Sequence, residues 1–350
     1  MKENINRSLA FILLGILYLF SLFTSLNQIE IRGAEPKRAI VSMEMDLNND
    51  YIVPTIHNET YYNKPPMFNW LQILFFKAFN SYDEVVCRLP GILSFILIGI
   101  GTFLLGRFIF DRNTGIVAAI FYLSFLNIYF YGTVYAGSVD IFLSLLIFLQ
   151  IGSLIFYSSK ENFYLLFIIS YTLAAIGFLT KGLPSIMVQF ISLIVLLIMQ
   201  KRIKKLFGLA HFSGILIFLL LIVAYFTLYS KHEDVVTFLV NTFAESSKRY
   251  DTSHGFIDYL TQLFHIPDRF LVTHLMPWSL LLLLLVKKKI RRLFKESSEL
   301  LLITLLLFSN IFLYFFAPDY SDRYLYPLVV AITQRNWYSS FCGFDSFKNF

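Results

Sequence analysis

Two segments near the N-terminus combine charged residues with a stiff or helix-starting backbone. Glu35 opens the segment EPKRAIVSMEM, with Lys37 and Arg38 close behind it. Lys64 lies in YYNKPPMFNW, whose double proline stiffens the backbone and offers no amide hydrogen. A carboxylate can take a proton from an attacking group, and a preorganised ammonium suits a phosphate. Together the two segments would allow chemistry on a phosphorylated substrate.

The same residues also have structural interpretations. Pro36 suits the first turn of a helix, so Glu35 could simply complement the helix dipole. Tyr61, Tyr62 and Trp70 are amphipathic aromatics of the kind found in the interfacial belt of membrane proteins. They could anchor the chain at a membrane surface, or they could line a sugar or a prenyl chain. The residue types alone leave both interpretations open.

Further charged residues lie beside long apolar segments. Asp140 follows YAGSV and opens an apolar stretch, where it is either the N-cap of a helix or faces a polar cavity. Lys181 in FLTKGLPS is either a snorkelling lysine or a second phosphate ligand. Arg323 and Tyr324 begin a late apolar stretch, where the guanidinium could grip a carboxylate or phosphate. His254 is isolated, so we expect it to bind no metal.

The composition shows what kind of scaffold must position these residues. The chain is 57% hydrophobic and 15% charged, whereas a soluble domain carries about 25% charged residues. This is the composition of an integral membrane protein. The formal charge of +6 is expected in cytoplasmic loops, so it does not indicate nucleic-acid binding. Cys87 and Cys342 form neither a disulfide framework nor a metal-binding spacing.

Hydropathy predicts a series of membrane spans. Leu9–Leu26 is too long for a signal peptide and is followed by no cleavage-site pattern, so we expect it to be an uncleaved first helix. The segment Phe68–Phe79 is amphipathic and is expected at the interface, as is a short helix after Glu35. The further expected spans are Leu89–Phe110, Gly115–Tyr131, Ile141–Tyr157, Phe163–Leu179, Leu183–Met199, Leu206–Leu228, Phe270–Val286, Leu300–Phe316 and the short Tyr324–Thr333.

Basic loops predict which side of the membrane each end faces. The runs KRIKK at Lys201–Lys205 and KKKIRRLFK at Lys287–Lys295 are cytoplasmic signals, and the expected spans place both on one side. The opposite side receives two long polar loops, residues 27–88 and 229–269. Glu35, Lys64, Asp140 and Lys181 all fall on that outward side. Charges so near the apolar slab are costly unless they face one another or a polar cavity.

These motifs resemble a known family. AEPKRAIVSMEM, YIVPTIHNETYYNKPPMFNWL, VCRLPGILS, SVDIFLSLLIF, GFLTKGLPS, HLMPW and SDRYLYPLVV occur in the order seen in bacterial glycosyltransferases of the GT-C superfamily. The likeness is to the aminoarabinose-transferase-like group, which is related to the protein O-mannosyltransferases. It covers about residues 31–328. It implies transfer of a sugar from a polyprenyl-phosphate carrier at the outer face of the bacterial inner membrane.

The resemblance also implies roles for individual residues. The family has an Asp-Glu pair in its first outward loop; here Ala34 and Glu35 stand there, so the role of catalytic base passes to Glu35. Some relatives bind a metal through a glutamate where this chain has Asn63, so we expect no metal and no other cofactor, with a divalent metal only as an alternative. The expected substrate-binding residues are Lys37, Arg38, Tyr62, Lys64, Asp140, Lys181, Arg323 and Tyr324.

The sequence thus predicts an all-α integral membrane protein. We expect a polytopic bundle of about nine to ten transmembrane helices, with amphipathic juxtamembrane helices in the first outward loop. Residues 1–334 would form the glycosyltransferase domain and residues 335–350 an atypical tail. The expected activity is inverting transfer of a hexose or pentose to a lipid A-like lipid, a glycan or a protein. A glycolipid transporter and an inactive truncated remnant remain the alternatives; the one-sided placement of polar residues favours the enzyme.

Overall fold

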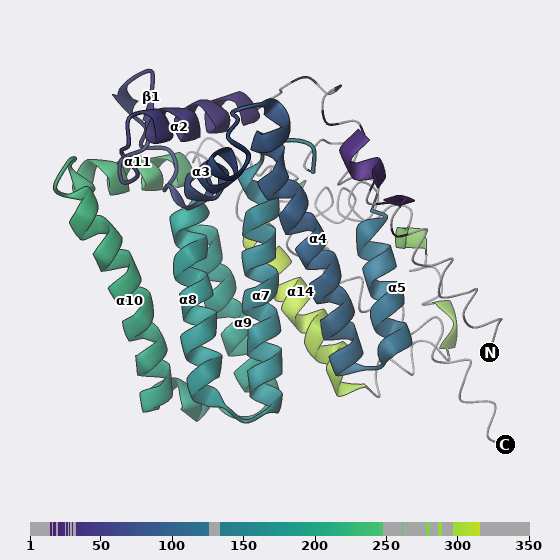
Figure 1. Ribbon diagram of the computed structural model, residues 1–350. Helices are drawn as coiled ribbons and strands as arrows, with labels where there is room; N and C mark the ends of the chain where they lie inside the picture. The colour runs from purple at the N-terminus through teal and green to yellow at the C-terminus, as the bar shows by residue number, and fades with distance from the viewer. Residues whose placement is uncertain are drawn as a thin grey trace.

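The computed structural model describes residues 33–125, 134–247 and 297–315, together with short pieces of residues 15–30 and of residues 261–288. Within these ranges the chain is almost entirely helical (Figure 1). Its helices are α2 (Glu35–Leu47), α3 (Met67–Phe79), α4 (Glu84–Ile109), α5 (Arg112–Leu123), α7 (Val139–Ser159), α8 (Phe163–Lys181), α9 (Leu183–Met199), the short 3-10 helix η1 (Ile203–Phe207), α10 (Leu209–Tyr229), α11 (Val235–Ser247) and α14 (Ser298–Phe315).

The expected membrane spans coincide with the long helices. In the described part of the chain, α4, α7, α8 and α10 are long and apolar enough to cross a membrane, and α9 and α14 are shorter apolar helices. The all-α polytopic fold is therefore confirmed. Helix α5 ends at Leu123, and the rest of its expected span, Gly115–Tyr131, runs into undescribed residues. The expected span Leu9–Leu26 lies partly outside the described residues, Phe270–Val286 mostly outside and Tyr324–Thr333 wholly outside.

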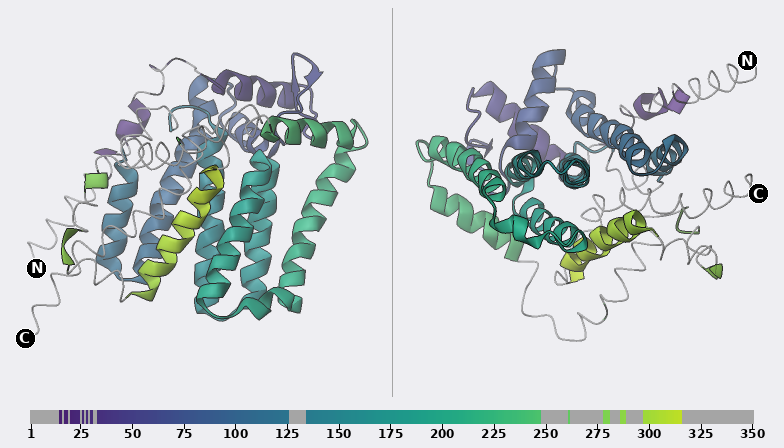
Figure 2. Two further views of the ribbon diagram at one scale, coloured as in Figure 1. Left: turned by 180° about the vertical axis from the view of Figure 1, so that it is seen from behind. Right: turned by 90° about the horizontal axis from the view of Figure 1, so that it is seen from below.

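The helices form an upright bundle with a cap of short elements across one end. Figures 1 and 2 show α2, α3 and α11 lying across the end at which α4 and α7 begin and α8 and α10 finish. The opposite end carries the basic residues Arg107, Arg112 and Lys160 and the lysines of η1, because α4, α7 and α9 finish there. This separation matches the predicted sidedness: basic loops at one end, and the short helices of the first outward loop at the other.

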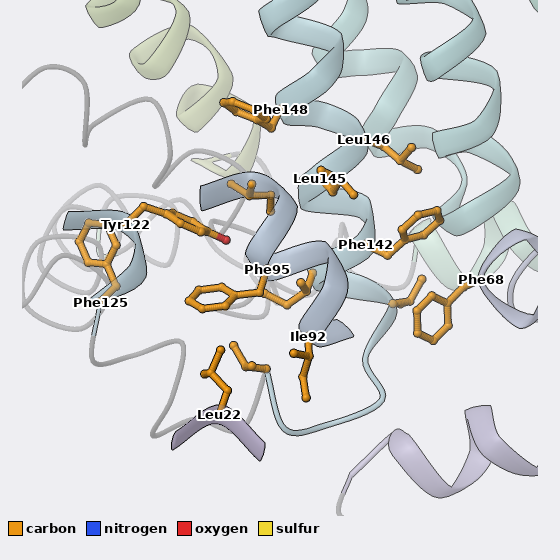
Figure 3. Close-up of a cluster of buried hydrophobic side chains, with 14 of the residues drawn as sticks. Leu22, Phe68, Ile92, Phe95, Tyr122, Phe125, Phe142, Leu145, Leu146 and Phe148 are labelled. Carbon is orange, nitrogen blue, oxygen red and sulfur yellow. The ribbon is translucent and has the colours of Figure 1, made fainter. Parts of the chain in front are cut away.

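A cluster of buried apolar side chains joins α3, α4, α5 and α7. Phe95 packs on Tyr122 with their ring centroids 5.2 Å apart, and Phe68 lies 6.0 Å from Phe142 (Figure 3). Aromatic pairs at such separations add to the dispersion energy of the interface. Small residues supply the rest of the fit, because a Cβ at Gly115 would lie 2.4 Å from the carbonyl oxygen of Phe103. Glycine there allows α5 to approach α4 closely.

Polar side chains join the helices inside the bundle. Gln150 of α7 donates to the Oε1 of Gln189 in α9 at 2.7 Å, and Gln189 donates to the hydroxyl of Ser170 in α8 at 2.8 Å. Asn310 of α14 donates to the hydroxyl of Ser192 at 3.0 Å. All five side chains are buried. Between apolar helices such hydrogen bonds hold neighbours in register, because an unpaired amide in an apolar surrounding is costly.

Candidate active site at the capped end

Helices α2 and α3 form a platform whose buried polar contacts fix it to the bundle. The hydroxyl of Ser42 donates to Gln72 at 2.7 Å and accepts from Asn69 at 2.8 Å. Gln72 in turn donates to the carbonyl of Cys87, in the first turn of α4, at 3.1 Å. Because Ser42 and Gln72 are fully buried, these bonds tie α2, α3 and α4 together. The start of α2, with Glu35, is thereby placed against the start of α4.

The solvent side of the platform is braced as well. Lys77 donates to the hydroxyl of Tyr51 at 2.8 Å and pairs with Asp46 at 3.3 Å. The hydrogen bond to Tyr51 and the pairing with Asp46 hold the pKa of Lys77 above its ordinary value. Next to it, the hairpin of β1 (Thr55–Ile56) and β2 (Glu59–Thr60) turns through two residues with positive φ. Glu44 of α2 accepts from both amides of that turn, at 2.6 and 3.2 Å.

Glu35 is buried and held by three donors. Its Oε1 accepts from Nε of Arg88 at 2.6 Å and from the amide of Gly137 at 3.1 Å, and its Oε2 accepts from the Nη2 of Arg88 at 3.2 Å. Arg88 is fully buried and also donates to the carbonyl of Leu26. The Nη2 of Arg88 lies 3.9 Å from Glu84, one turn earlier in α4. A two-pronged pairing of this kind fixes the orientation of the carboxylate.

A second buried ion pair lies close by. Asp140, in the first turn of α7, pairs with Lys181 at the end of α8, and both side chains are buried. Ser138 is the N-cap of α7 and donates its hydroxyl to the Oδ2 of Asp140 at 3.0 Å. Because Gly137 contacts Glu35 and directly precedes this cap, the first turn of α7 joins the two ion pairs. The N-cap role considered for Asp140 therefore falls to Ser138.

Lys64 and Tyr62 lie on the segment that leads into α3. Lys64 is half-buried and stands just before the buried Pro65 and Pro66. The carbonyl of Tyr62 accepts from Thr242 of α11 at 3.2 Å, and Tyr62 is half-buried. Thr242 also lies beside the turn at Gly182, where an added Cβ would be 3.7 Å from its methyl group. Through Thr242, the segment with Lys64 is placed next to the turn that follows Lys181.

The remaining predicted residues are placed differently. Lys37 is exposed on α2, and Arg38 is buried with its guanidinium carbon 5.4 Å from the ring centre of Tyr61. Arg38 thus packs into the platform, while Lys37 remains accessible from outside. Arg323 and Tyr324 lie outside the described residues, as does His254.

Sequence reasoning missed one residue at the centre of the site. Arg88 belongs to the motif VCRLPGILS, yet only the structure shows that it is the partner of Glu35. A signal was present: an arginine at the beginning of an apolar span is costly to bury and therefore needs an acidic partner. The sequence did not indicate which acid that would be, because Glu84 stands one turn away and Glu35 lies far along the chain.

The residues around Asn63 do not fit a metal. The Oδ1 of Asn63 is buried and accepts no hydrogen bond from a described residue, which would suit a ligand atom. However, in residues 33–125, 134–247 and 297–315 no three His, Cys, Asp or Glu side chains group closely enough to hold a metal ion. One amide oxygen beside a lysine is a poor donor set for a divalent cation, which needs several oxygen or nitrogen ligands. The groups that the described residues offer at this end of the bundle are suited to proton transfer and anion binding.

The arrangement is suited to holding an anionic group at a membrane face. Two buried carboxylates are each fixed by a cation, and two lysines, Lys37 and Lys64, remain at least partly exposed around them. A fixed carboxylate can accept a proton, and fixed ammonium groups can stabilise a negative charge that develops on a leaving group. Glu35 begins α2, Asp140 lies in the first turn of α7 and Lys181 ends α8, so these groups gather at the capped end of the bundle (Figure 1).

Comparisons with known proteins agree with this arrangement. Residues 63–227 match the family model for dolichyl-phosphate-mannose-protein mannosyltransferase. The undecaprenyl phosphate-alpha-4-amino-4-deoxy-L-arabinose arabinosyl transferase of Yersinia pestis (strain Pestoides F) is 30% identical over 177 residues. That of Yersinia enterocolitica is 30% identical over 181 residues. In both, the match covers 49% of this chain and 31% of the relative, so the chain matches only about a third of these relatives' length.

Two solved structures share the fold. The crystal structure of ArnT from Cupriavidus metallidurans bound to undecaprenyl phosphate superposes with a TM-score of 0.76 and 16% sequence identity, covering 94% of this chain and 59% of ArnT. The apo structure of the same protein gives a TM-score of 0.73, also at 16% identity, with coverage of 95% and 60%. At this identity the likeness shows a common fold.

Proposed function

Because residues 63–227 of this chain match the family model for dolichyl-phosphate-mannose-protein mannosyltransferase, we propose that the chain is a membrane glycosyltransferase. It would take a sugar from a polyprenyl-phosphate carrier, as the names of its aminoarabinose transferase relatives describe for them. The acceptor would be a lipid A-like lipid, a glycan or a protein. The observation that carries the proposal is the fixed carboxylate of Glu35 at the start of α2, which lies at the same end of the bundle as α3, the helix that follows Lys64 (Figure 1).

The proposed step is a single displacement at the anomeric carbon. A hydroxyl of the acceptor attacks that carbon while the bond from the carbon to the carrier phosphate breaks, and the phosphate keeps the bonding electron pair. The proton of the hydroxyl passes to Glu35. Among the described residues, Arg88 alone donates to its Oε2, at 3.2 Å, so this oxygen retains a lone pair for the proton. Attack from the face opposite the phosphate inverts the configuration of the sugar.

The proposed role of the lysines follows from the charge of the leaving group. A polyprenyl phosphate departs with more negative charge than it carried as a diester, and fixed ammonium groups lower the free energy of that developing charge. Lys64 is the proposed principal contact, with Lys37 reaching in from α2. Lys181 would add its charge from the buried pair with Asp140, which holds the ammonium in place. Arg38, Tyr62, Arg323 and Tyr324 complete the proposed binding residues.

The proposed cellular site follows from the sidedness. The capped end bears the exposed part of the first outward loop, and the basic residues occupy the opposite end. With basic loops in the cytoplasm, the active site would face the periplasm or the outside of the cell. A carrier anchored in the membrane by its prenyl chain would present its phosphate at that level.

The test is transfer by the full chain reconstituted in proteoliposomes with a radiolabelled polyprenyl-phosphate sugar and extracted envelope lipids. We expect label to move to an acceptor, and Glu35→Gln to reduce that rate by at least about a hundredfold, which is the lower range for a general base. Glu84→Gln is the matched control, because Glu84 also lies near Arg88 but is half-exposed, and it should transfer at the wild-type rate.

Each outcome decides between the alternatives. If the labelled donor crosses the bilayer without changing its chemical form, the protein is a transporter and not a transferase. If the wild-type chain does neither with any envelope fraction, the transferase proposal is rejected. If a folded Glu35→Gln variant transfers sugar at the wild-type rate, the transferase proposal stands but Glu35 is not the base.

A further inference from the structure

The corner between α10 and α11 holds the segment that carries Lys64. Glu233 follows the last turn of α10, and its amide donates to the carbonyl of Tyr229 at 3.0 Å. Its Oε1 accepts from the hydroxyl of Thr60 at 2.8 Å, and its Oε2 lies 3.4 Å from the hydroxyl of Tyr62. The contact with Thr60 is a strong charge-assisted hydrogen bond, and the one with Tyr62 is long and weaker.

Helix α11 makes a second hydrogen bond to the same segment. The hydroxyl of Thr242 donates to the carbonyl of Tyr62 at 3.2 Å. Tyr62 is therefore bound at its carbonyl by α11 and at its hydroxyl by the corner. Three residues further on, the buried Pro65 begins the Pro65–Pro66 pair that leads into α3. Lys64 thus lies between two fixed points, and its backbone position follows from both.

The corner itself is braced by a helix cap and by aromatic packing. Asp234 caps the start of α11, accepting from the amide of Thr237 at 2.8 Å and from its hydroxyl at 2.6 Å. These bonds hold the pKa of the Asp234 carboxyl below its ordinary value. Beneath the corner, Tyr229 and Phe238 are buried against each other with ring centroids 5.1 Å apart. A corner braced in this way keeps the side chains that it binds, those of Thr60 and Tyr62, in fixed positions.

Apolar contacts extend this grip along the first outward loop. Val53 is buried in the same cluster as Tyr229 and Phe238. The hydroxyl of Tyr225 donates to the carbonyl of Ile52 at 3.2 Å. The loop of residues 52–64 therefore rests on α10 and α11, far from it in the sequence. Glu233 provides the carboxylate that fixes the end of this loop nearest to Lys64.

We infer that Glu233 is a positioning residue for the carrier phosphate, acting through Thr60 and Tyr62 to set the place of Lys64. The inference rests on the proposed function, because it assigns Lys64 the phosphate. Glu233 lies beyond residues 63–227, the segment that matches the family model. Its role is therefore one that the family match does not describe. A lysine on a loosened segment would still carry its charge but would meet the phosphate less often in the right geometry.

The test uses undecaprenyl phosphate itself as the probe, so it requires neither the sugar nor the acceptor. Binding to the full chain in nanodiscs is measured for the wild type, Glu233→Ala, Lys64→Ala and the double variant. We expect about tenfold weaker binding for Glu233→Ala and a similar or larger loss for Lys64→Ala. If Glu233 acts through Lys64, the double variant should bind no more weakly than Lys64→Ala, a strong non-additivity.

Two further variants separate position from charge and from folding. Glu233→Gln keeps an acceptor for Thr60 without the charge, and should bind within about threefold of the wild type. Tyr229→Phe is the matched control, because that buried hydroxyl makes no hydrogen bond to a described residue, and it should bind as the wild type. If Glu233→Ala does not fold, Thr60→Val removes the stronger of the two contacts of Glu233 and replaces that variant in the same cycle.

The outcomes distinguish this inference from the proposed function. A wild type that does not bind undecaprenyl phosphate overturns both. A wild type that binds, with losses at Glu233 and Lys64 that simply multiply, overturns the positioning role and leaves the transferase standing. Wild-type affinity in Glu233→Ala, or equal losses in Glu233→Ala and Glu233→Gln, would do the same.

Discussion

At the scale of single residues, the site depends on how Glu35 and Arg88 compensate one another. Either charge alone would be expensive at this depth, because both side chains are almost fully buried. As a pair they satisfy each other, and the amide of Gly137 and the carbonyl of Leu26 take up further hydrogen-bonding groups. The pair therefore has two consequences that can be separated by experiment: it keeps the capped end folded, and it presents a carboxylate in a fixed orientation.

Replacing Arg88 by methionine tests the first consequence. We expect Arg88→Met to destabilise the chain by about 3–5 kcal/mol, because it leaves the Glu35 carboxylate buried without its cation. The double variant Arg88→Met/Glu35→Leu should recover most of that loss, since an apolar pair of similar volume needs no counter-charge. Thermal unfolding in detergent, followed by intrinsic fluorescence, measures both variants.

The same double variant separates stability from catalysis. It should unfold near the wild-type temperature and yet transfer no sugar, because it lacks the carboxylate. Transfer by this variant would show that Glu35 only stabilises the fold. A double variant as unstable as Arg88→Met would show that the ion pair has no balancing role.

At the scale of elements, close packing between helices positions the helix that carries Arg88. Helix α4 carries Arg88 in its first turns, and α5 packs along its later turns through Gly106 and Gly115. A Cβ at Gly115 would meet the carbonyl oxygen of Phe103 and the amide nitrogen of Arg107, both backbone atoms. A side chain at this position cannot be accommodated by a rotamer change and must push the helices apart.

The Gly115→Ala substitution tests this packing. We expect it to destabilise the chain by about 1–3 kcal/mol, the usual cost of overpacking, despite the better helix propensity of alanine. Gly152→Ala is the control, because the nearest atom to its added Cβ is 3.9 Å away, and it should be neutral or stabilising. Thermal unfolding of the two variants in the same detergent gives the comparison. If Gly115→Ala and Gly152→Ala are equally stable, the close contact between α4 and α5 does not determine the fold.

At the scale of the whole molecule, the two ends of the bundle differ in chemistry. The capped end has α2, α3, the hairpin and α11, whereas the described connections at the other end are short and include the basic 3-10 helix η1. A membrane protein oriented by its basic loops would place η1 in the cytoplasm and the hairpin outside.

Cysteine labelling in intact spheroplasts tests this orientation. In a Cys342→Ser background, Glu59→Cys in the exposed hairpin should react with a membrane-impermeant maleimide at once. Lys204→Cys in η1 should react only after the membrane is permeabilised. The remaining native thiol, Cys87, is buried and should contribute little background. Labelling with the reverse pattern would invert the topology and place the site in the cytoplasm.

Much of the fold followed from the sequence because membrane spans are encoded locally. The runs of apolar residues predicted α9 as Leu183–Met199 and the interfacial α3 to within one residue, and a proline in the first turn marked the start of α2. Basic loops predicted which end is which. The motifs also indicated the family, and that resemblance was confirmed by the family match at residues 63–227. Each of these signals lies within one short stretch of chain, so no distant contact was needed to recognise it.

The tertiary structure alone decided which charges meet. Glu35 and Arg88 are 53 residues apart, Asp140 and Lys181 are 41 apart, and Thr60 and Glu233 are 173 apart. No local period relates such positions, and Glu84 was an equally plausible partner for Arg88 by sequence. Tertiary packing decides which buried charges become neighbours. A charge is tolerated in the interior only where an opposite charge lies beside it, because an unpaired buried charge is costly. The sequence therefore determined the helices and their sidedness, while the packing of α2, α4, α7 and α10 made a site of their charged residues.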